Sequence, residues 1–387
     1  MKLTLKLPVL SIFTVLIYFS IFVNFYYVPG YNAVRNVFLL ATAIYLYSKK
    51  INNGYKILKV NVVASIFVAV IILTSLFNFV YTKEHINNMI VFCFSLIIIF
   101  NFLQYVAYKN KILSTIRLWL FLHIIVLFIN DFLLICYPNL VYINDFYYLI
   151  GNKFDVSYSH CFLITMFYSI RFYEEARLNV SDFIIGSLLA CYSFFIMLQV
   201  GCSTGIVGLL FFVILFLLLL LNKPVLVDKK GCITLLFISV FFIIGYQAIL
   251  NISFIQKIIT DMLGHTLTIS GRTNIYKKLP LILKGHWLGG FGFGTSYTLG
   301  MKFGGFPNTQ NGVMEWVWQV GLFGTALLLF LIWVSLDDIQ NHKSIFVFMI
   351  LIDLFLIVST IEIAFNLMFF SVLAIIYGMN LEHKLYY

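Results

Sequence analysis

The chain has 387 residues, of which 62% are hydrophobic, 18% aromatic and only 10% charged, and its formal net charge is +10. Soluble domains carry about 25% charged and about 45–50% apolar residues, so the composition excludes a soluble globular protein. It favours a chain whose apolar surface lies in a bilayer. Lys and Arg fall mostly between the apolar segments, so the positive charge indicates membrane topology and not nucleic-acid binding.

The first segment of the chain combines a basic start with an apolar run. Residues 1–6 contain Lys2 and Lys6, and residues 7–23 are almost entirely apolar. This pattern resembles a signal peptide, but no small-x-small cleavage site follows it and many more apolar segments do. We therefore expect an uncleaved first transmembrane helix.

Apolar runs long enough to cross a bilayer, about 20 residues each, recur along the whole sequence. The predicted spans are 8–28, 31–48, 58–80, 86–108, 112–136, 157–172, 182–200, 205–222, 231–250, 312–335, 344–361 and 362–380. We predict an all-α polytopic membrane protein with about twelve transmembrane helices. Residues 1–387 would form a single integral membrane domain.

The distribution of Lys and Arg predicts the orientation of these spans. With a cytoplasmic N-terminus, sixteen basic residues face the cytoplasm, and only Arg35, Lys83 and Lys153 lie in short outer loops. Both termini are therefore expected in the cytoplasm. The long segment 251–311, between the ninth and tenth spans, becomes a large outer loop in which we expect short helices.

The loop 251–311 differs in composition from the rest of the chain. Its stretch 285–305 holds eight of the 23 glycines, and the loop has six basic residues against one acidic residue, Asp261. Glycine backbone N–H groups beside cationic side chains suit a phosphate or diphosphate group, although a flexible linker with surface lysines would look the same. Gly290-x-Gly292-x-Gly294 lacks the last glycine of a dinucleotide-binding loop. The scattered cysteines and the absence of ligand spacings predict no metal and no cofactor.

Short motifs follow one another in this loop in a specific order. The sequence reads Ser270-Gly271-Arg272, then Gly289-Gly290-Phe291-Gly292-Phe293-Gly294, then Gln310-Asn311, and after nine more residues Gly321-Leu322-Phe323-Gly324. The region 270–324 resembles the O-antigen polymerase and ligase superfamily of bacterial envelope glycan assembly. That superfamily has an SGR stretch, a GxGxG-like stretch and a His-Asn pair followed by GxxG, all late in the chain around a large outer loop.

The resemblance implies a glycosyltransferase in the bacterial cytoplasmic membrane. It would polymerise oligosaccharide repeat units, carried on undecaprenyl diphosphate, into O-antigen, capsular polysaccharide or exopolysaccharide at the outer face. The implied partners are this lipid-linked oligosaccharide, membrane lipids, and possible chain-length regulator and flippase proteins. Neither a cofactor nor nucleic acid is implied.

Two alternatives remain open. The family histidine before Asn311 is Gln310 here, which argues against a ligase that transfers finished glycan to lipid A-core or another acceptor. A transporter of lipid-linked glycan is the second alternative. Few charges fall in the middle of the predicted spans, and no repeated halves are visible, so a transporter ranks lower.

Candidate catalytic residues follow from the chemistry that the resemblance implies. Arg272 is the first candidate to bind the leaving diphosphate, because a guanidinium forms paired hydrogen bonds with phosphate oxygens. Glu315 and Glu362, near the outer ends of their predicted helices, are candidates to orient or deprotonate the acceptor hydroxyl. His265 and His286 could replace the missing histidine. Asp353 falls in the middle of a span, and we expect a structural role for it.

Further residues are candidates for substrate binding. Arg35 lies at the outer end of a span, where the distribution of positive charge disfavours it, and its structural alternative is an ion pair with Asp131. The remaining candidates lie in the outer loop and its motifs: Ser270, Gly271, Lys277, Gly292, Gly294, Gln310 and Asn311.

Overall fold

A computed structural model describes residues 8–25, 28–53, 56, 58–138, 147–175, 177–250, 252–257, 261 and 272–387. The helices are α1 (Val9–Ile17), the π-helix η1 (Tyr18–Phe22), α2 (Tyr31–Asn53), α3 (Lys59–Phe77), α4 (Phe79–Thr82), α5 (Ile86–Tyr108), α6 (Ile112–Cys136), α8 (Lys153–Glu174), α9 (Val180–Gln199), α10 (Ser203–Leu220), α11 (Lys229–Leu250), α12 (Ser253–Lys257), α13 (Arg272–Ile282), α14 (Ser296–Phe303), α15 (Gly312–Ser335), α16 (Lys343–Val358) and α17 (Leu367–Tyr386). Over these residues the only strands are β1 (Tyr147–Tyr148) and β2 (Gly151–Asn152), which pair antiparallel. The all-α class is confirmed.

Six of the described helices are long and apolar enough to cross a membrane. They are α3, α5, α6, α9, α10 and α15. Helices also occupy the other predicted spans, but the last boundary was wrong. Predicted spans 344–361 and 362–380 were almost continuous, whereas α16 ends at Val358 and α17 begins at Leu367. The side chain of Asn366 caps α17 by accepting the N–H of Phe369 at 3.2 Å, which fixes the start of that helix.

The hairpin of α16 and α17 forms the centre of the bundle. Helix α16 packs against α8, α10 and α11, while α17 packs against α5, α15 and η1. Most side chains of both helices are buried, which explains why they are apolar on every face. In contrast, α9 buries little of its surface within the protein, so its apolar side chains are available to lipid.

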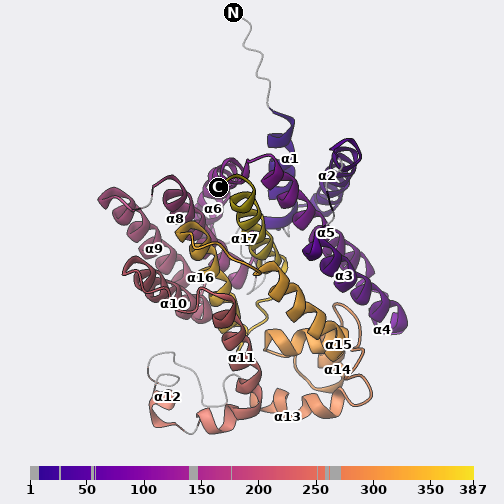
Figure 1. The fold of residues 1–387 in the computed structure, drawn as a ribbon. Coiled ribbons are helices and arrows are strands. Elements are labelled where there is room, and N and C mark those ends of the chain that lie inside the picture. Colours follow the sequence, from indigo (N-terminus) through magenta and orange to yellow (C-terminus); the bar gives the residue numbers. More distant parts are fainter. Residues whose placement is uncertain are drawn as a thin grey trace, which may run out of the picture.

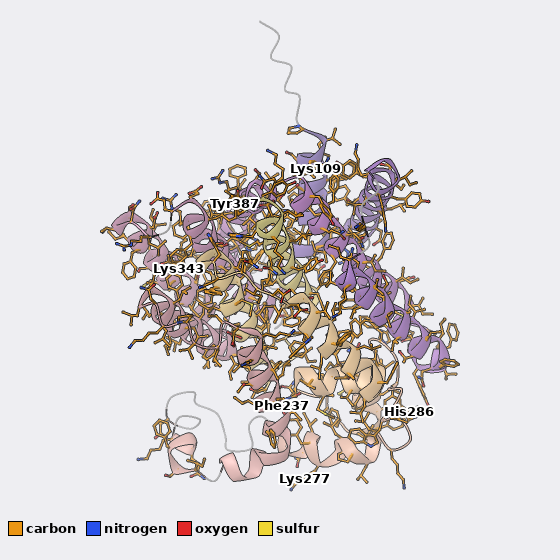
Figure 2. All side chains as sticks on the ribbon, viewed as in Figure 1. Lys109, Phe237, Lys277, His286, Lys343 and Tyr387 are labelled. Atoms are coloured by element: carbon orange, nitrogen blue, oxygen red, sulfur yellow. The ribbon has the colours of Figure 1, made fainter. Side chains whose placement is uncertain are left out.

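The helical arrangement separates two ends of the molecule. The start of α1 and the end of α17 lie at one end, and α12 and α13 lie at the other (Figure 1). Lys109 and Tyr387 mark the first end, and Lys277 and His286 mark the second (Figure 2). Helices α13 and α14 lie beside the first half of α15 (Figure 1). The described residues of the segment 272–311 therefore lie towards the end of the molecule where α15 begins.

Candidate functional site

A break in α15 receives the glycine-rich segment. Gly321 has φ 69° and ψ −177°, which is not helical, so α15 consists of two helical pieces. The N–H of Phe291 donates to the carbonyl of Trp318 at 2.7 Å, and the N–H of Gly292 donates to that of Gln319 at 2.9 Å. Backbone groups that the break would otherwise leave unpaired are thus satisfied by the inserted segment.

Glycine is required at particular positions of this contact. Gly290 has φ 68°, and a Cβ there would lie 2.6 Å from the carbonyl carbon of Gln319. A Cβ on Gly321 would lie 2.1 Å from the carbonyl oxygen of Leu288. In contrast, a Cβ on Gly289 would meet no atom within 4 Å. The motif therefore reflects close backbone approach and left-handed conformation at specific residues.

Gly292 and Gly294 were predicted to bind an anion through their N–H groups. In the structure the Gly292 N–H binds the Gln319 carbonyl at 2.9 Å. The Gly294 N–H donates to the side-chain oxygen of Gln319 at 3.3 Å. Both N–H groups are occupied by protein acceptors, so in this conformation they position the loop and are not available to an anion.

Glu315 connects the motif segments to one another. Its side chain is only 2% exposed. One carboxylate oxygen accepts the side-chain N–H of Gln319 at 3.0 Å, and the other accepts the hydroxyl of Thr309 at 3.1 Å. Because Gln319 in turn binds Gly294, Glu315 joins the loop before α15 to the glycine-rich segment. It is not the solvated helix-end residue that its position would allow.

Asn311 anchors the beginning of α15. Its side-chain oxygen accepts the N–H of Met314 at 3.0 Å, which makes it the helix N-cap. Its side-chain nitrogen donates to the carbonyls of Ser239 at 3.3 Å and Thr360 at 3.2 Å. Asn311 is fully buried and ties α15 to α11 and to the linker 359–366. We call residues 287–294, 308–311, Glu315, Gln319 and Gly321 the outer assembly, after the loop that the sequence predicts to lie outside.

Gln310 and α13 meet beside this assembly. Gln310 has φ 53°, and its side-chain N–H donates to the side-chain oxygen of Asn308 at 2.8 Å. The Tyr276 hydroxyl donates to the Gln310 carbonyl at 3.1 Å. Arg272 is the first residue of α13, one turn before Tyr276, whose hydroxyl contacts the 308–311 segment. Its side chain, and the candidates Ser270, Gly271 and His265, lie outside what the structure describes.

The lysines and the histidine of this region have separate positions. Lys277 is exposed on α13. Lys278 donates to the carbonyl of Gly304 at 2.7 Å and so connects α13 to the end of α14. The His286 ring lies 4.0 Å from that of Phe291, stacked on it, and its Nδ1 is 3.2 Å from the carbonyl of Gly290. His286 therefore packs on the glycine-rich segment at the edge of the outer assembly.

Glu362 lies in the linker between α16 and α17 and is half-buried. The linker contacts Asn311 through Thr360. Glu362 is also close enough to Tyr158 and Cys202 for electrostatic interaction with both. The structure therefore places Glu362 between the outer assembly and the starts of α8 and α10.

Arg35 belongs to a different part of the bundle. It lies on α2, which packs against α1, η1 and α5. Its Nε is buried and has no hydrogen-bond partner among the described residues. Asp131, its predicted structural partner, is bound elsewhere. The structure does not bring Arg35 together with Glu315 or Asn311, and it does not form the expected ion pair.

Asp131 is the centre of a second group of polar side chains that sequence reasoning missed. Its carboxylate accepts the Tyr192 hydroxyl at 2.8 Å and the Asn130 amide at 3.1 Å. The Nε2 of His160 lies 3.4 Å from both carboxylate oxygens, and the Nδ1 of His160 lies 3.3 Å from the Ser193 hydroxyl. Asp131, His160 and Asn130 are at most 2% exposed.

His123 extends this group towards α1. The Nε2 of His123 lies 2.9 Å from the Ser159 carbonyl, which can only accept, so Nε2 carries the proton. Its Nδ1 then accepts the hydroxyl of Tyr18 at 2.9 Å. We call Tyr18, His123, Asn130, Asp131, Ser159, His160, Tyr192 and Ser193 the buried polar network, since all of them except Tyr192, which is 40% exposed, are buried. The sequence did hold a signal for this group, because one acid and two histidines fall inside predicted spans. The sequence does not show, however, which of these side chains meet across the helices.

Asp353 has the structural position that was expected for it. It is fully buried in α16, and one carboxylate oxygen accepts the thiol of Cys232 at 3.3 Å. This contact joins α16 to α11. Within the described residues no cluster of three or more His, Cys, Asp or Glu side chains could hold a metal ion.

No protein-family model matches the chain, and no curated protein is significantly similar to it. The chemistry available at the site therefore rests on the residues themselves. Around the beginning of α15 the structure gathers the start of α13, the outer assembly and the linker that carries Glu362. This arrangement offers buried hydrogen-bonded groups that fix the backbone and a half-buried carboxylate beside them.

Proposed function

We propose that this protein polymerises undecaprenyl-diphosphate-linked oligosaccharide repeat units at the outer face of a bacterial cytoplasmic membrane. The observation that carries the proposal is the meeting of the motif segments. The end of Ser270-Gly271-Arg272, the glycine-rich segment 289–294 and the Gln310-Asn311 pair lie up to about 40 residues apart in the sequence. The helix that begins at Arg272 reaches Gln310 through the Tyr276 side chain, and the other two segments contact or cap α15 directly.

The proposed reaction transfers a growing glycan from its lipid diphosphate to an incoming repeat unit. The acceptor hydroxyl attacks the anomeric carbon, the bond from that carbon to the diphosphate oxygen breaks, and the hydroxyl proton leaves to a base. Arg272 stabilises the negative charge that develops on the leaving diphosphate. Glu362 orients the acceptor or takes its proton, because its carboxylate is only half-buried.

Other residues have supporting roles in this proposal. Glu315 contacts Thr309 and Gln319 and has almost no exposed surface, so it positions the outer assembly and does not touch substrate. Lys277 is exposed on α13, where it attracts the anionic substrate. In the proposed orientation both termini are cytoplasmic, twelve helices cross the membrane, and the outer assembly faces outward.

The test is a gel of surface and lipid-linked glycans from a strain that lacks this protein. Loss of a polymerase leaves single repeat units on the normal acceptor, with no ladder of longer chains. A full ladder that accumulates on undecaprenyl diphosphate would instead identify a ligase. As a control, expression of the intact protein in the same strain, at its normal level in the membrane, should restore the ladder.

A transporter of lipid-linked glycan is the second candidate, and the buried polar network favours it. Ionisable side chains at membrane depth occur in substrate and ion pathways, and Asp131, His160 and His123 are all buried. Loss of a transporter would leave repeat units on the cytoplasmic side, with neither single units nor a ladder at the surface. The same gel, combined with an assay for surface-exposed repeat units, separates the two functions.

A further inference from the structure

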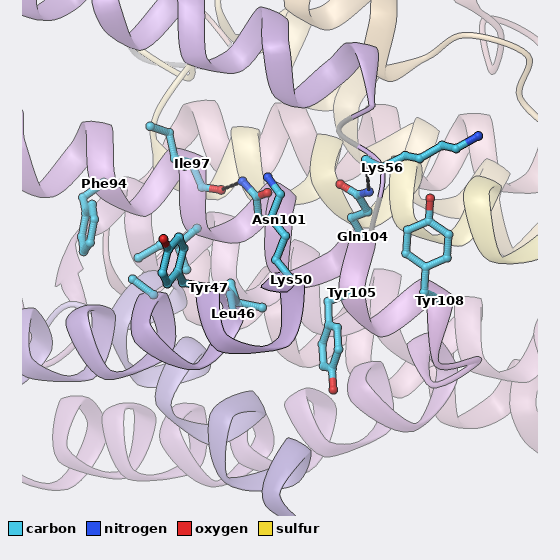
Figure 3. Close-up of a pocket in the computed structure, with 12 residues that line it drawn as sticks. Leu46, Tyr47, Lys50, Lys56, Phe94, Ile97, Asn101, Gln104, Tyr105 and Tyr108 are labelled. Carbon is cyan, nitrogen blue, oxygen red and sulfur yellow. Dashed lines mark hydrogen bonds between the residues drawn. The ribbon is translucent and has the colours of Figure 1, made fainter. Parts of the chain in front are cut away.

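A groove between α2 and α5 lies at the end of the molecule opposite the outer assembly. Figure 3 shows this groove, with Lys50 reaching alongside Asn101 and Lys56 beside Gln104. Its cavity has a volume of about 220 Å³. Pockets for whole small molecules are typically about 300–1,000 Å³. The groove therefore fits one part of a larger amphipathic ligand better than a whole soluble one.

One end of the groove is basic and carries no compensating acid. Lys50 and Lys56 line it, and no Asp or Glu does. Neither lysine takes part in an ion pair within the described part of the chain. Lys109 adds to this charge, since its Nζ lies 5.9 Å from the centroid of the Tyr105 ring, which also lines the groove. The basic end therefore suits an anion.

The other part of the groove is apolar. Ala43, Leu46, Phe94 and Ile97 line it, and all four are half-buried. Their remaining exposed surface continues the apolar flank of α2, on which Ile44 is 62% exposed. A membrane protein presents such a flank to lipid acyl chains. The groove thus combines a basic end with an apolar wall that follows the direction of the helices.

The polar side chains between these two parts are held in place by the protein. The side-chain nitrogen of Gln104 donates to the carbonyl of Lys56 at 2.8 Å, and its oxygen accepts from Asn61 at 2.6 Å. The Asn101 side chain is fixed by the Ile97 carbonyl at 2.8 Å and by Asn61 at 3.0 Å. The floor of the groove is therefore preformed, and only the exposed side chains of Lys50 and Lys56 need to move to meet a ligand.

We propose that this groove binds one anionic glycerophospholipid of the leaflet that borders the chain ends. The phosphate lies between Lys50 and Lys56, and an acyl chain lies along Ala43, Leu46 and Ile97. The site is independent of the proposed polymerase reaction, because it lies on other helices at the other end of the molecule.

The test measures lipid binding to the purified full-length protein in detergent by native mass spectrometry. Phosphatidylglycerol and phosphatidylcholine of equal chain length are added separately. A lysine close to an anionic lipid surface contributes a factor of about five in affinity. We therefore expect the Lys50→Ala, Lys56→Ala double variant to bind phosphatidylglycerol roughly twenty-five-fold more weakly, with little change for phosphatidylcholine.

Two further variants separate groove binding from general surface attraction. The matched control Lys223→Ala, Lys230→Ala removes the same charge outside the groove and should keep nearly full affinity. Ala43→Trp fills the apolar wall without changing the charge and should also displace the lipid. Equal weakening in both double variants, or equal binding of the two lipids by the intact protein, would overturn the proposal. So would displacement of phosphatidylglycerol by an equal amount of a polyprenyl phosphate.

Discussion

The outer assembly and the buried polar network both hold buried polar groups, but they are built differently. In the outer assembly most hydrogen bonds involve the backbone, as in the pairs from Phe291 to Trp318 and from Gly292 to Gln319. In the buried polar network the central contacts join side chains, and Asp131 receives three of them. The outer assembly is therefore held mainly by backbone hydrogen bonds, whereas the buried polar network depends on the carboxylate of Asp131.

Because the two regions are built differently, they leave different traces in the amino-acid sequence. Backbone approach demands glycine at defined positions, so the outer assembly leaves a motif. A side-chain network demands only one polar residue on each of several helices, so it leaves isolated residues without a shared spacing. The predictions below use substitutions that disturb one region and leave the other unchanged.

The largest effect is expected for Gly290→Ala. Gly290 has a left-handed conformation, and its new Cβ would lie 2.6 Å from backbone atoms of Gln319 and Gly321. Backbone strain and a backbone clash occur at the same residue. Together they should lower the free energy of unfolding by more than roughly 4–5 kcal/mol, which is exceptional for a single substitution. Thermal unfolding of the purified protein measures the loss. Gly289→Ala is the matched control, and equal destabilisation by both would contradict the insertion of this segment into α15.

Asp131→Ala should give the next largest effect. A buried donor that loses its acceptor typically costs about 1–3 kcal/mol, and here His160 and Asn130 both lose their partner, as does the Tyr192 hydroxyl. Asp338→Asn is the control, because the Asp338 side chain is 79% exposed in its pair with Lys384 and asparagine tolerates the φ of 50° at this position. If the buried polar network has only a structural role, the amount of polymer should fall in proportion to the amount of folded protein in the membrane. Normal folding with total loss of surface repeat units would favour the transporter.

Arg272→Ala tests whether the outer assembly serves chemistry as well as structure. Loss of a group that stabilises developing charge typically costs about 2.7–4 kcal/mol, or a factor of about 10²–10³ in rate. We expect the polymer ladder to disappear while the amount of protein in the membrane stays normal. Arg272→Lys should restore little, since lysine lacks the paired donors. Lys284→Ala is the control, because Lys284 is exposed and has no role in the proposed site, and a full ladder from Arg272→Ala would remove Arg272 from the site.

Local properties of the sequence predicted the helices but not their contacts. Length and hydropathy are properties of a segment, so each apolar run corresponds to a helix. The break at Gly321 depends on a segment 30 residues earlier, and the burial of Glu315 depends on Thr309 and Gln319. The partners of Asp131 depend on how the three helices α6, α8 and α9 are rotated about their axes. For the same reason the sequence could not show that Asp131 pairs with His160 and Tyr192 rather than with Arg35, the alternative that its position allowed.

The smallest effect is expected from Asp337, outside both regions. Its carboxylate accepts a hydrogen bond from Lys229 at 2.7 Å, and this bond holds the pKa of Asp337 below its usual value. A lowered folded-state pKa stabilises the protein at pH values above the unfolded pKa, about 3.9. The contribution is lost as the pH falls through the folded pKa. The side chain is 47% exposed, so the contribution should stay below about 1 kcal/mol.

The measurement compares the melting temperatures of the intact protein and Asp337→Asn at pH 6 and pH 3. We expect a small gap at pH 6 that narrows at pH 3, because protonation of the Asp337 carboxylate then begins to remove its contribution. Lys229 also lies 3.4 Å from the centroid of the Trp333 ring. If the gap does not narrow at pH 3, the substitution has disturbed the packing of Lys229 on Trp333, and the charge of Asp337 is not the cause.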